Sequence, residues 1–269
     1  MEHRLRRSVV EICRRMYERG FIAATDGNVS VRLAADRILV TPSGVNKGYL
    51  SEGDLVVVDR SGRKLSGRGS ASSEIRMHLA VYALRPDVRA VVHAHPPLSI
   101  AFSIAGESLA QCMVPEVIVS LGDVPTAPYA TPTTADVPKM LEPLVLRYDA
   151  IMLERHGSLT LGRDLEEAYN RLETMEHTAK ISLAVKQIGK FRPLPKEEVD
   201  RLVAMGRALG LTRAHTACQT CGLCDIEIPG GSTAGEGGRE PAPSQNEAPP
   251  DRERLVAMIL EEIGKLSPR

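Results

Sequence analysis

The sequence has few aromatic residues and no net charge. Its 269 residues include no tryptophan, three phenylalanines and six tyrosines, and 34 Lys and Arg residues balance 34 Asp and Glu residues. A neutral chain has no overall field that would hold a nucleic acid or an anionic membrane, and few rings are available to stack on bases. We therefore expect neither a nucleic acid nor a membrane as a partner.

Long apolar runs are also missing. No stretch approaches the roughly 20 apolar residues of a membrane span. The first 15 residues carry charges on both sides of a short apolar run, unlike a signal peptide. Five cysteines in a chain of this length do not indicate a secreted disulfide scaffold. Because 43% of the residues are hydrophobic, these features predict a globular cytoplasmic protein.

Hydrophobic periodicity predicts an α/β body. Apolar spacing and capping signals predict helices over residues 2–20, 74–84, 164–190 and 196–210, the second capped by Ser72 and Ser73. Alternation or short apolar runs predict strands in 28–33, 37–41, 54–59 and 88–95, and a hairpin over 150–162. Mixed strand and loop is expected over 113–122, and a proline-rich loop over 125–138.

The composition changes at Pro229. Residues 229–250 contain five glycines and five prolines, and their only apolar side chains are alanines, so they cannot bury a core. Residues 251–269 return to a helical apolar pattern. The sequence therefore predicts a body over residues 1–228, a disordered linker over 229–250 and a short terminal helix.

His93 and His95 carry the strongest indication of chemistry. Side chains at positions i and i+2 of a strand point to the same face, so two imidazoles can converge on one metal ion. His156 ends another predicted strand segment, and Glu74 lies in the first turn of a predicted helix. Three imidazoles and a carboxylate suit Zn²⁺ or a similar divalent ion. His78, four residues after Glu74, is a rival ligand.

Three short polar segments fall at predicted turns or at a helix start. Together they offer hydroxyls, N–H groups exposed by glycine and a helix N-terminus, which suits a phosphate without Lys or Arg. Each segment taken alone is more often a plain turn or cap. The candidate phosphate-binding residues are Thr25, Gly27, Asn28, Ser43, Gly44, Ser72 and Ser73.

A second cluster of ligating residues lies near the end of the body, over residues 215–224. Cys218, Cys221 and Cys224 have C-x₂-C-x₂-C spacing, and His215 precedes them by three residues. This set could ligate zinc or an iron–sulfur cluster, although the fourth cysteine of the ferredoxin pattern is missing. Free structural thiols are the alternative.

Six motifs, taken in order, resemble the class II aldolase/adducin family: TDGNVSVR, TPSG, SSEIRMHLAVY, VVHAHPP, APYAT and RHGSLTLG. The resemblance covers about residues 5–190 and is nearest to the L-fuculose-1-phosphate aldolase branch. It implies an α/β/α sandwich around a mainly antiparallel sheet. It also implies a homotetramer with active sites at the subunit interfaces.

The resemblance assigns roles to the candidate residues. One Zn²⁺ per subunit would bind His93, His95 and His156, with Glu74 as a displaceable fourth ligand and as the catalytic acid/base. The seven polar-loop residues would bind the substrate phosphate. The reaction implied is cleavage of a ketose 1-phosphate to dihydroxyacetone phosphate and an aldehyde such as lactaldehyde.

One position departs from the aldolase pattern. The fuculose enzymes use a tyrosine of the neighbouring subunit to protonate the aldehyde oxygen, and Val114 stands at that position here. Glu116 or a water could replace it. L-Fuculose or L-rhamnulose 1-phosphate is the first choice of substrate, and 5-deoxyribulose 1-phosphate and 5-methylthioribulose 1-phosphate are rivals.

Other functions within the resemblance are weaker. The ribulose-phosphate 4-epimerases have Asp where this chain has Glu74, and the HAHPP motif favours an aldolase over the dehydratase and decarboxylase branches. A metal-free adducin-like scaffold would not need three histidines and Glu74. A redox or metal-sensing module would instead depend on the cysteine cluster.

The terminal segment 251–269 has one apolar stripe. Its members recur at helical spacing: Leu255, Val256, Ile259, Leu260, Ile263 and Leu266. A short amphipathic helix on a flexible tether suits docking on a partner's groove, or packing on its own oligomer. It resembles the encapsulation peptides of bacterial microcompartments. The resemblance implies a shell protein as partner and a location inside such a shell.

Overall fold

The computed structural model describes residues 2–109, 112–131, 133–134 and 136–211. The cluster of His215, Cys218, Cys221 and Cys224 lies outside these residues, as do the linker at 229–250 and the tail at 251–269. The expectations for those segments stay predictions. In the part of the chain that is described, no helix has the length and apolar character to cross a membrane.

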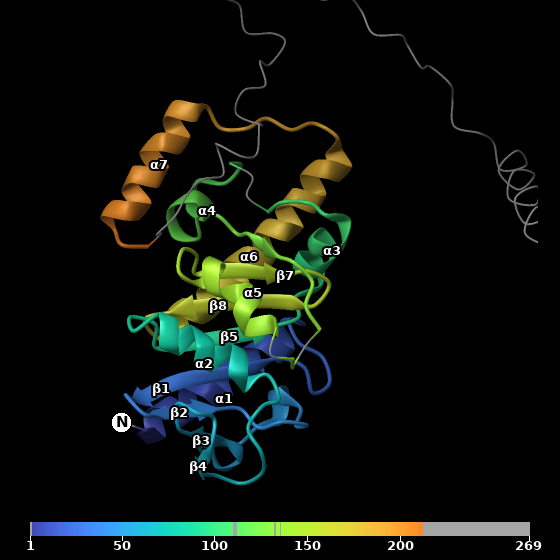
Figure 1. Cartoon of the computed structure of the whole chain (residues 1–269). Helices are drawn as coiled ribbons and strands as arrows, with labels where there is room; N and C mark the ends of the chain where they lie inside the picture. Colours follow the sequence, from blue (N-terminus) through green and yellow to red (C-terminus); the bar gives the residue numbers. More distant parts are fainter. Residues whose placement is uncertain (1, 110–111, 132, 135, 212–269) are drawn as a thin grey trace, which may run out of the picture. The chain divides into compact units, whose positions relative to one another are not determined.

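Helices and strands alternate along the described chain (Figure 1). The helices are α1 (Glu2–Glu18), α2 (Ile75–Leu84), α3 (Pro97–Ala105), α4 (Pro115–Ser120), α5 (Asp136–Val145), α6 (Leu165–Ile188) and α7 (Lys196–Ala208), with 3₁₀ turns η1 (Lys47–Tyr49) and η2 (Glu52–Asp54). The strands are β1 (Asn28–Ala34), β2 (Arg37–Val40), β3 (Val56–Val58), β4 (Lys64–Ser66), β5 (Ala90–Ala94), β6 (Thr126–Ala127), β7 (Ala150–Leu153) and β8 (Gly157–Gly162).

The strands form one sheet in the order β4-β3-β2-β1-β5-β8-β7-β6. Every neighbouring pair is antiparallel except β6 and β7. In the centre of the sheet, His93 of β5 lies opposite Asn28 of β1 on one side and Leu159 of β8 on the other. This register places polar side chains of β1 and β5 next to each other.

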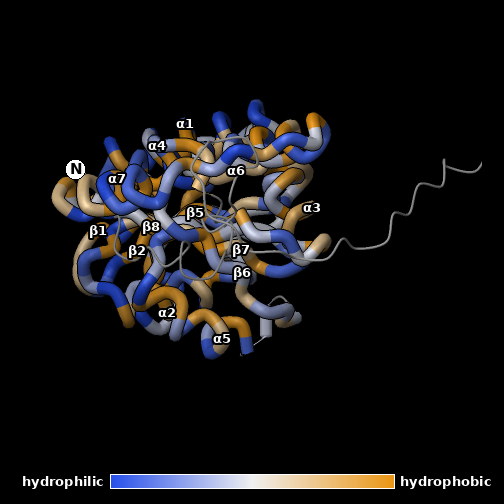
Figure 2. The backbone as a smooth tube through the Cα atoms, turned by 90° about the horizontal axis from the view of Figure 1, so that it is seen from above, coloured by the Kyte–Doolittle hydropathy of each residue, from blue (hydrophilic) through white to orange (hydrophobic). Residues whose placement is uncertain are grey.

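Helices cover both faces of the sheet (Figure 2). Strand alternation divides β5 between two cores: Val92 and Ala94 face the core that includes α1 and α6, and Val91 faces the core of α2 and α5. His93 follows the parity of Val91, so its side chain lies on the α2 side. The predicted α/β/α sandwich around a mainly antiparallel sheet is confirmed.

The structure differs from the predicted elements in several places. Helix α3 and strand β4 were not predicted, and the stretch 125–138, expected as a loop, contains β6 and the start of α5. The predictions for residues 113–122 and for the start of α2 were also wrong.

Residues 113–122, predicted as mixed strand and loop, contain helix α4. Pro115 starts this helix with its φ already fixed, and Ile118 is buried against Val199 of α7. Apolar residues in a short run fit a buried helix as well as a strand, so periodicity alone misassigned them. At the start of α2, the cap residue is Glu74 rather than a serine.

Candidate metal centre

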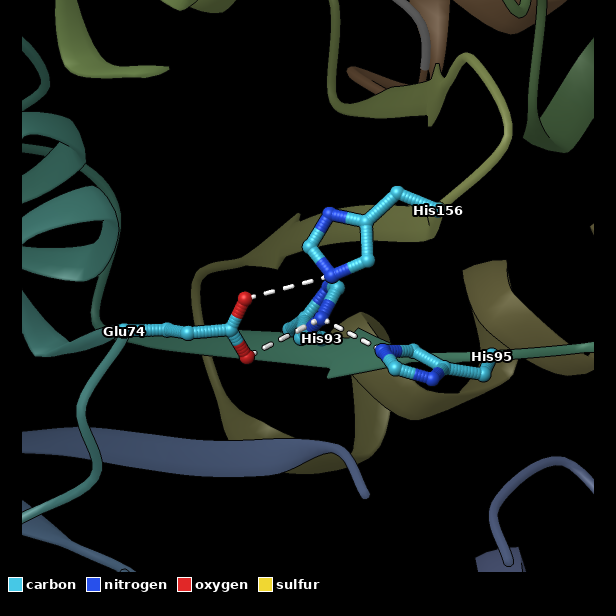
Figure 3. A group of neighbouring side chains, drawn as sticks. All are labelled: Glu74, His93, His95 and His156. Carbon is cyan, nitrogen blue, oxygen red and sulfur yellow. Dashed lines mark hydrogen bonds and ion pairs between the residues drawn. The ribbon is translucent and has the colours of Figure 1, made fainter. Parts of the chain in front are cut away.

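Four side chains from separate segments meet at one end of β5 (Figure 3). His93 lies in β5 and His95 directly follows it, while His156 precedes the first residue of β8. Glu74 is the N-cap of α2, but its carboxylate makes no capping hydrogen bond and points to the histidines. One ligand atom from each of the four lies within 4.8 Å of the others. The sequence prediction of these four neighbours is confirmed as geometry.

The spacing of the ligand atoms fits a divalent ion. His93 Nε2 lies 3.0 Å from His95 Nε2 and 3.3 Å from Glu74 Oε2, and His156 Nε2 lies 3.2 Å from Glu74 Oε1. Zinc bound tetrahedrally at about 2.1 Å separates its ligands by about 3.4 Å. Three imidazoles and one carboxylate are also the donor types that zinc prefers.

Backbone and carboxylate contacts orient two of the rings. The His93 Nδ1–H donates to the carbonyl oxygen of Ser158 over 2.8 Å, which turns Nε2 toward the cluster. His95 Nδ1 lies 3.4 Å from the Asp26 carboxylate, which leaves its Nε2 toward the same point. Two nitrogen lone pairs 3.0 Å apart repel unless a proton or a cation lies between them.

The protonation states also suit a metal. Burial, reinforced by the charges of His93 and His156, lowers the pKa of His95 to about 4, so this ring is neutral at pH 7. Burial alone would raise the pKa of Glu74. Hydrogen bonds with His156 and His93 instead hold the pKa of that carboxyl well below its usual range. Neutral imidazoles and an ionised carboxylate are the forms that bind metal.

Asn28 joins the candidate phosphate loops to the metal cluster. Its side-chain amide donates to Glu74 Oε2 over 2.9 Å, and its own carbonyl oxygen Oδ1 is buried with no hydrogen-bond partner among the described residues. The Ser72 hydroxyl accepts from the Glu74 N–H over 3.3 Å. These contacts restrain Glu74 from both sides, and this explains why its carboxylate does not cap α2.

The three predicted polar loops lie side by side. Pro42 and Ala71 form an isolated antiparallel bridge, and the Ser43 N–H donates to the Ser70 carbonyl. The Thr41 N–H donates to the Val29 carbonyl, which brings the first loop beside the second. Of the seven candidate residues, three are buried, Gly27, Asn28 and Ser72. The other four are exposed: Thr25, Ser43, Gly44 and Ser73.

The rival ligand His78 lies elsewhere. It is fully buried, and its Nδ1 is hydrogen bonded to the Ser30 hydroxyl over 2.7 Å, which also contacts the Tyr82 hydroxyl. Burial lowers the pKa of His78 to about 3, so it stays neutral. One helical turn after Glu74 places this ring deeper along β1, where Ser30 holds it away from the metal ligands.

Sequence reasoning missed three groups that hold the centre in place. The first is Asp26, which the sequence placed only in a predicted turn and which lies beside His95. Glu176 of α6 is buried and accepts hydrogen bonds from the Leu98 N–H, the Ser99 N–H and the Ser99 hydroxyl, at 2.7–2.9 Å. It thereby anchors the start of α3, two residues after His95. Lys47 is the third, and no local signal marks its hydrogen bond to the Thr25 carbonyl, 22 positions away.

Val114 and Glu116, considered for the aldehyde end of the substrate, lie at the start of α4. Both line a cavity of about 900 Å³ together with Phe21, Leu98 and Glu176, and none of the four metal-site side chains lines it. Glu116 is exposed. Within one chain, neither residue is bonded to the described metal-site side chains.

Comparison with known proteins agrees with this geometry. Residues 7–183 match the family described as the class II aldolase and adducin N-terminal domain. The chain belongs to the class II aldolase and adducin family. The metal-site cluster and all three polar loops fall inside the matched residues.

Relatives in this family have two different activities. The L-fuculose phosphate aldolase of Methanococcus vannielii is 33% identical over 67% of this chain and 97% of that protein. The 3-oxo-tetronate 4-phosphate decarboxylase of Haemophilus influenzae is 34% identical over 74% of this chain and 96% of that protein.

Solved structures in this family have the same fold as this chain. YgbL of Escherichia coli superimposes with a TM-score of 0.71 at 32% identity and covers 75% of this chain and 99% of its own. An L-fuculose 1-phosphate aldolase superimposes with a TM-score of 0.69 at 29% identity, over 75% and 95% of the two chains. This chain therefore belongs to an aldolase family and has a cluster of metal-type ligands. Family membership alone does not identify its reaction, because relatives of similar identity have different activities.

Gly157 has no room for a side chain, so a larger residue there should disturb the metal-site rings. A Cβ there would lie 2.9 Å from His95 Cδ2 and 3.2 Å from His93 Cε1, and closer still to the Ala94 carbonyl oxygen. We expect Gly157→Ala to lower the free energy of unfolding by about 1–3 kcal/mol and to weaken zinc binding, because the added methyl displaces both rings. Urea denaturation and zinc titration measure the two effects.

Gly53→Ala is the matched control, because a Cβ there meets only the Ser51 hydroxyl oxygen, at 3.9 Å. It should change neither property. Wild-type zinc affinity in Gly157→Ala would contradict the close packing described here.

The cluster predicts one strong zinc site per chain. Isothermal titration of chelator-treated protein should show one ion bound, and zinc should raise the melting temperature, since ligand at 100 times its Kd stabilises by about 2.7 kcal/mol. His156→Ala should lose most of this binding. His177→Ala, which removes an exposed imidazole of α6, should keep it. Equal zinc affinity in the two variants would rule the cluster out as the site.

Proposed function

We propose that the protein is a zinc-dependent aldolase that cleaves a ketose 1-phosphate to dihydroxyacetone phosphate and an aldehyde. The observation that supports this best is the position of Glu74. Its carboxylate contacts His93, His156 and Asn28, and its backbone lies beside the loops that offer hydroxyls and N–H groups to a phosphate. An ionised acid/base thus lies between a metal-type cluster and an anion-binding surface.

The proposed cleavage of the C3–C4 bond uses both the metal-type cluster and Glu74. Removal of the proton from the C4 hydroxyl lets the C3–C4 bond break, and its electron pair passes into an enediolate of dihydroxyacetone phosphate. A bound divalent ion would supply Lewis-acid stabilisation of that charge. Glu74, which takes up the proton released from the C4 hydroxyl through a water, then delivers a proton to C3, and it removes that proton in the condensation direction. Asn28 keeps the carboxylate in place through its amide.

The decarboxylase relatives favour one second candidate. Loss of CO₂ from a 3-oxo-tetronate 4-phosphate leaves an electron pair on C2, conjugated with the C3 carbonyl. Protonation of that enediolate at C2 also gives dihydroxyacetone phosphate. The two reactions therefore share an enediolate, a phosphate and a proton transfer, and they differ in the group that leaves: an aldehyde or CO₂. Glu74 would perform the same step in both.

Fewer residues of the described chain are candidates for binding the aldehyde half of the substrate than for binding its phosphate. Lactaldehyde, released from L-fuculose or L-rhamnulose 1-phosphate, stays the first choice, with 5-deoxyribulose and 5-methylthioribulose 1-phosphates as rivals. A ribulose 5-phosphate 4-epimerase would need retro-aldol cleavage and recombination within one site. The glutamate at position 74 disfavours it.

Proton exchange tests the role of Glu74. In D₂O, the zinc-loaded enzyme should exchange a hydroxymethyl proton of dihydroxyacetone phosphate, observed by NMR. Glu74→Gln should slow this exchange by about 10²–10⁴-fold while still binding one metal ion through three histidines. Glu107→Gln, which alters an exposed carboxylate paired with Lys186, is the control and should exchange normally. Wild-type exchange in Glu74→Gln would exclude the role.

Product analysis on the same enzyme separates the reactions. The four ketose 1-phosphates named above and 3-oxo-tetronate 4-phosphate are offered, and aldehyde, CO₂ and dihydroxyacetone phosphate are measured. Aldehyde release supports the aldolase, and CO₂ release supports the decarboxylase. Turnover of neither class, with epimerisation of ribulose 5-phosphate, would overturn both.

The assembly proposed for this enzyme is a homotetramer whose segment 251–269 attaches it to a microcompartment shell. The apolar stripe of the tail sequence supports this. A chain ending at residue 250 should keep full activity, while the tail fused to a fluorescent protein should form puncta in cells that express the shell. Diffuse fluorescence, or loss of activity on truncation, would favour packing of the tail on its own oligomer.

A further inference from the structure

Lys47 is a buried cation under the polar loops. The residue is 2% exposed, and its ammonium donates to the carbonyl oxygens of Thr25 and Val45, each over 2.7 Å. One carbonyl belongs to the loop at 25–28 and the other to the loop at 43–47. A single side chain thus connects two of the three segments that carry the candidate phosphate-binding residues.

The charge of Lys47 has no countercharge in the described residues. No carboxylate there comes within ion-pair distance of its ammonium, and its bonding partners are neutral carbonyls. Burial therefore lowers the pKa of Lys47 from its ordinary value, and interactions with Cys13, Asp26 and Glu74 oppose that shift only in part. A buried charge without a partner is unfavourable, so buried lysines are normally paired.

The surface above Lys47 is open to a ligand. Gly44 has a φ of +69°, and a Cβ there would meet no atom within 4 Å. Thr25, which supplies one of the two carbonyl groups, and Ser43, two residues before the other, are exposed. The third loop joins them through the Ser43 N–H, which donates to the Ser70 carbonyl. An anion seated on these loops would lie on the backbone segments that the ammonium joins.

We propose that Lys47 is the cation of the phosphate-binding site, stored beneath the loops and neutralised when the phosphate of the substrate binds. This inference rests on the proposed function, which supplies a phosphorylated substrate. The loops provide the directional hydrogen bonds that the sequence predicted. Lys47 adds the attraction for negative charge that those neutral groups lack.

A purely structural Lys47 would behave differently. If the residue only ties two loops together, its removal destabilises the fold and disturbs binding as a consequence. If it stores charge for an anion, replacement by an apolar side chain of similar length relieves an unpaired buried charge and stabilises the fold, while binding weakens. Stability and phosphate affinity then move in opposite directions.

The experiment compares Lys47→Met, Lys47→Gln and wild type as full-length zinc-loaded proteins. Inorganic phosphate is titrated by ³¹P NMR, and melting temperature and zinc affinity are measured on the same samples. Lys64→Met is the matched control, since Lys64 also donates to a loop carbonyl, that of Gly69 over 3.0 Å, but from an exposed position. Lys47→Gln keeps a hydrogen-bond donor and loses only the charge.

We expect both Lys47 variants to bind phosphate at least 10-fold more weakly than wild type, with zinc affinity within twofold. The melting temperature of Lys47→Met should equal or exceed that of wild type, and Lys64→Met should match wild type throughout. Wild-type phosphate affinity in Lys47→Met overturns the proposal. The proposal is also overturned if Lys47→Met lowers both the melting temperature and the phosphate affinity while Lys47→Gln restores both to wild-type values. A wild-type enzyme with no phosphate affinity would instead refute the phosphate site of the proposed function itself.

Discussion

The convergence of four metal-site ligands on one point is the constraint on which the rest of the structure depends. Three imidazole nitrogens and a carboxylate point at one small volume, and the His93 and His95 nitrogens are only 3.0 Å apart. Such an arrangement stores unfavourable energy unless a cation or a proton occupies the centre. The surrounding fold therefore has to hold each ligand rigidly, and it does so with contacts that are mostly buried.

Each ligand is held by a different part of the sandwich. The β5–β8 pairing lets His93 donate to the Ser158 carbonyl, and the Gly157 that precedes it allows the two strands to approach. Glu176 fixes the chain after His95 by binding the start of α3. Asn28 restrains Glu74 from β1. The centre is thus a property of the whole sheet and of both helical layers.

The local parts of this site were predictable, and the distant parts were not. His93 and His95 share a face because successive side chains of a strand point to opposite faces. The sequence also predicted Asp164 as the cap of α6, and its carboxylate accepts a hydrogen bond from the Glu167 N–H. The convergence of His156 and Glu74 needed the family motifs, because nothing local relates two segments 82 positions apart. Helix α4 was missed because valine and isoleucine favour strands, although they also fit a buried helix. Lys47 and Glu176 were missed because they bind backbone groups that only the folded chain brings near.

The most direct test of the central claim is anomalous diffraction at the zinc edge from crystals of the zinc-loaded protein. This account predicts one peak per chain, about 2.0–2.2 Å from the Nε2 atoms of His93, His95 and His156, with a Glu74 carboxylate oxygen in or next to the coordination sphere. The Nδ1 of His93 should remain bonded to the Ser158 carbonyl. A fully occupied zinc bound elsewhere, with these three imidazoles left uncoordinated, would contradict it.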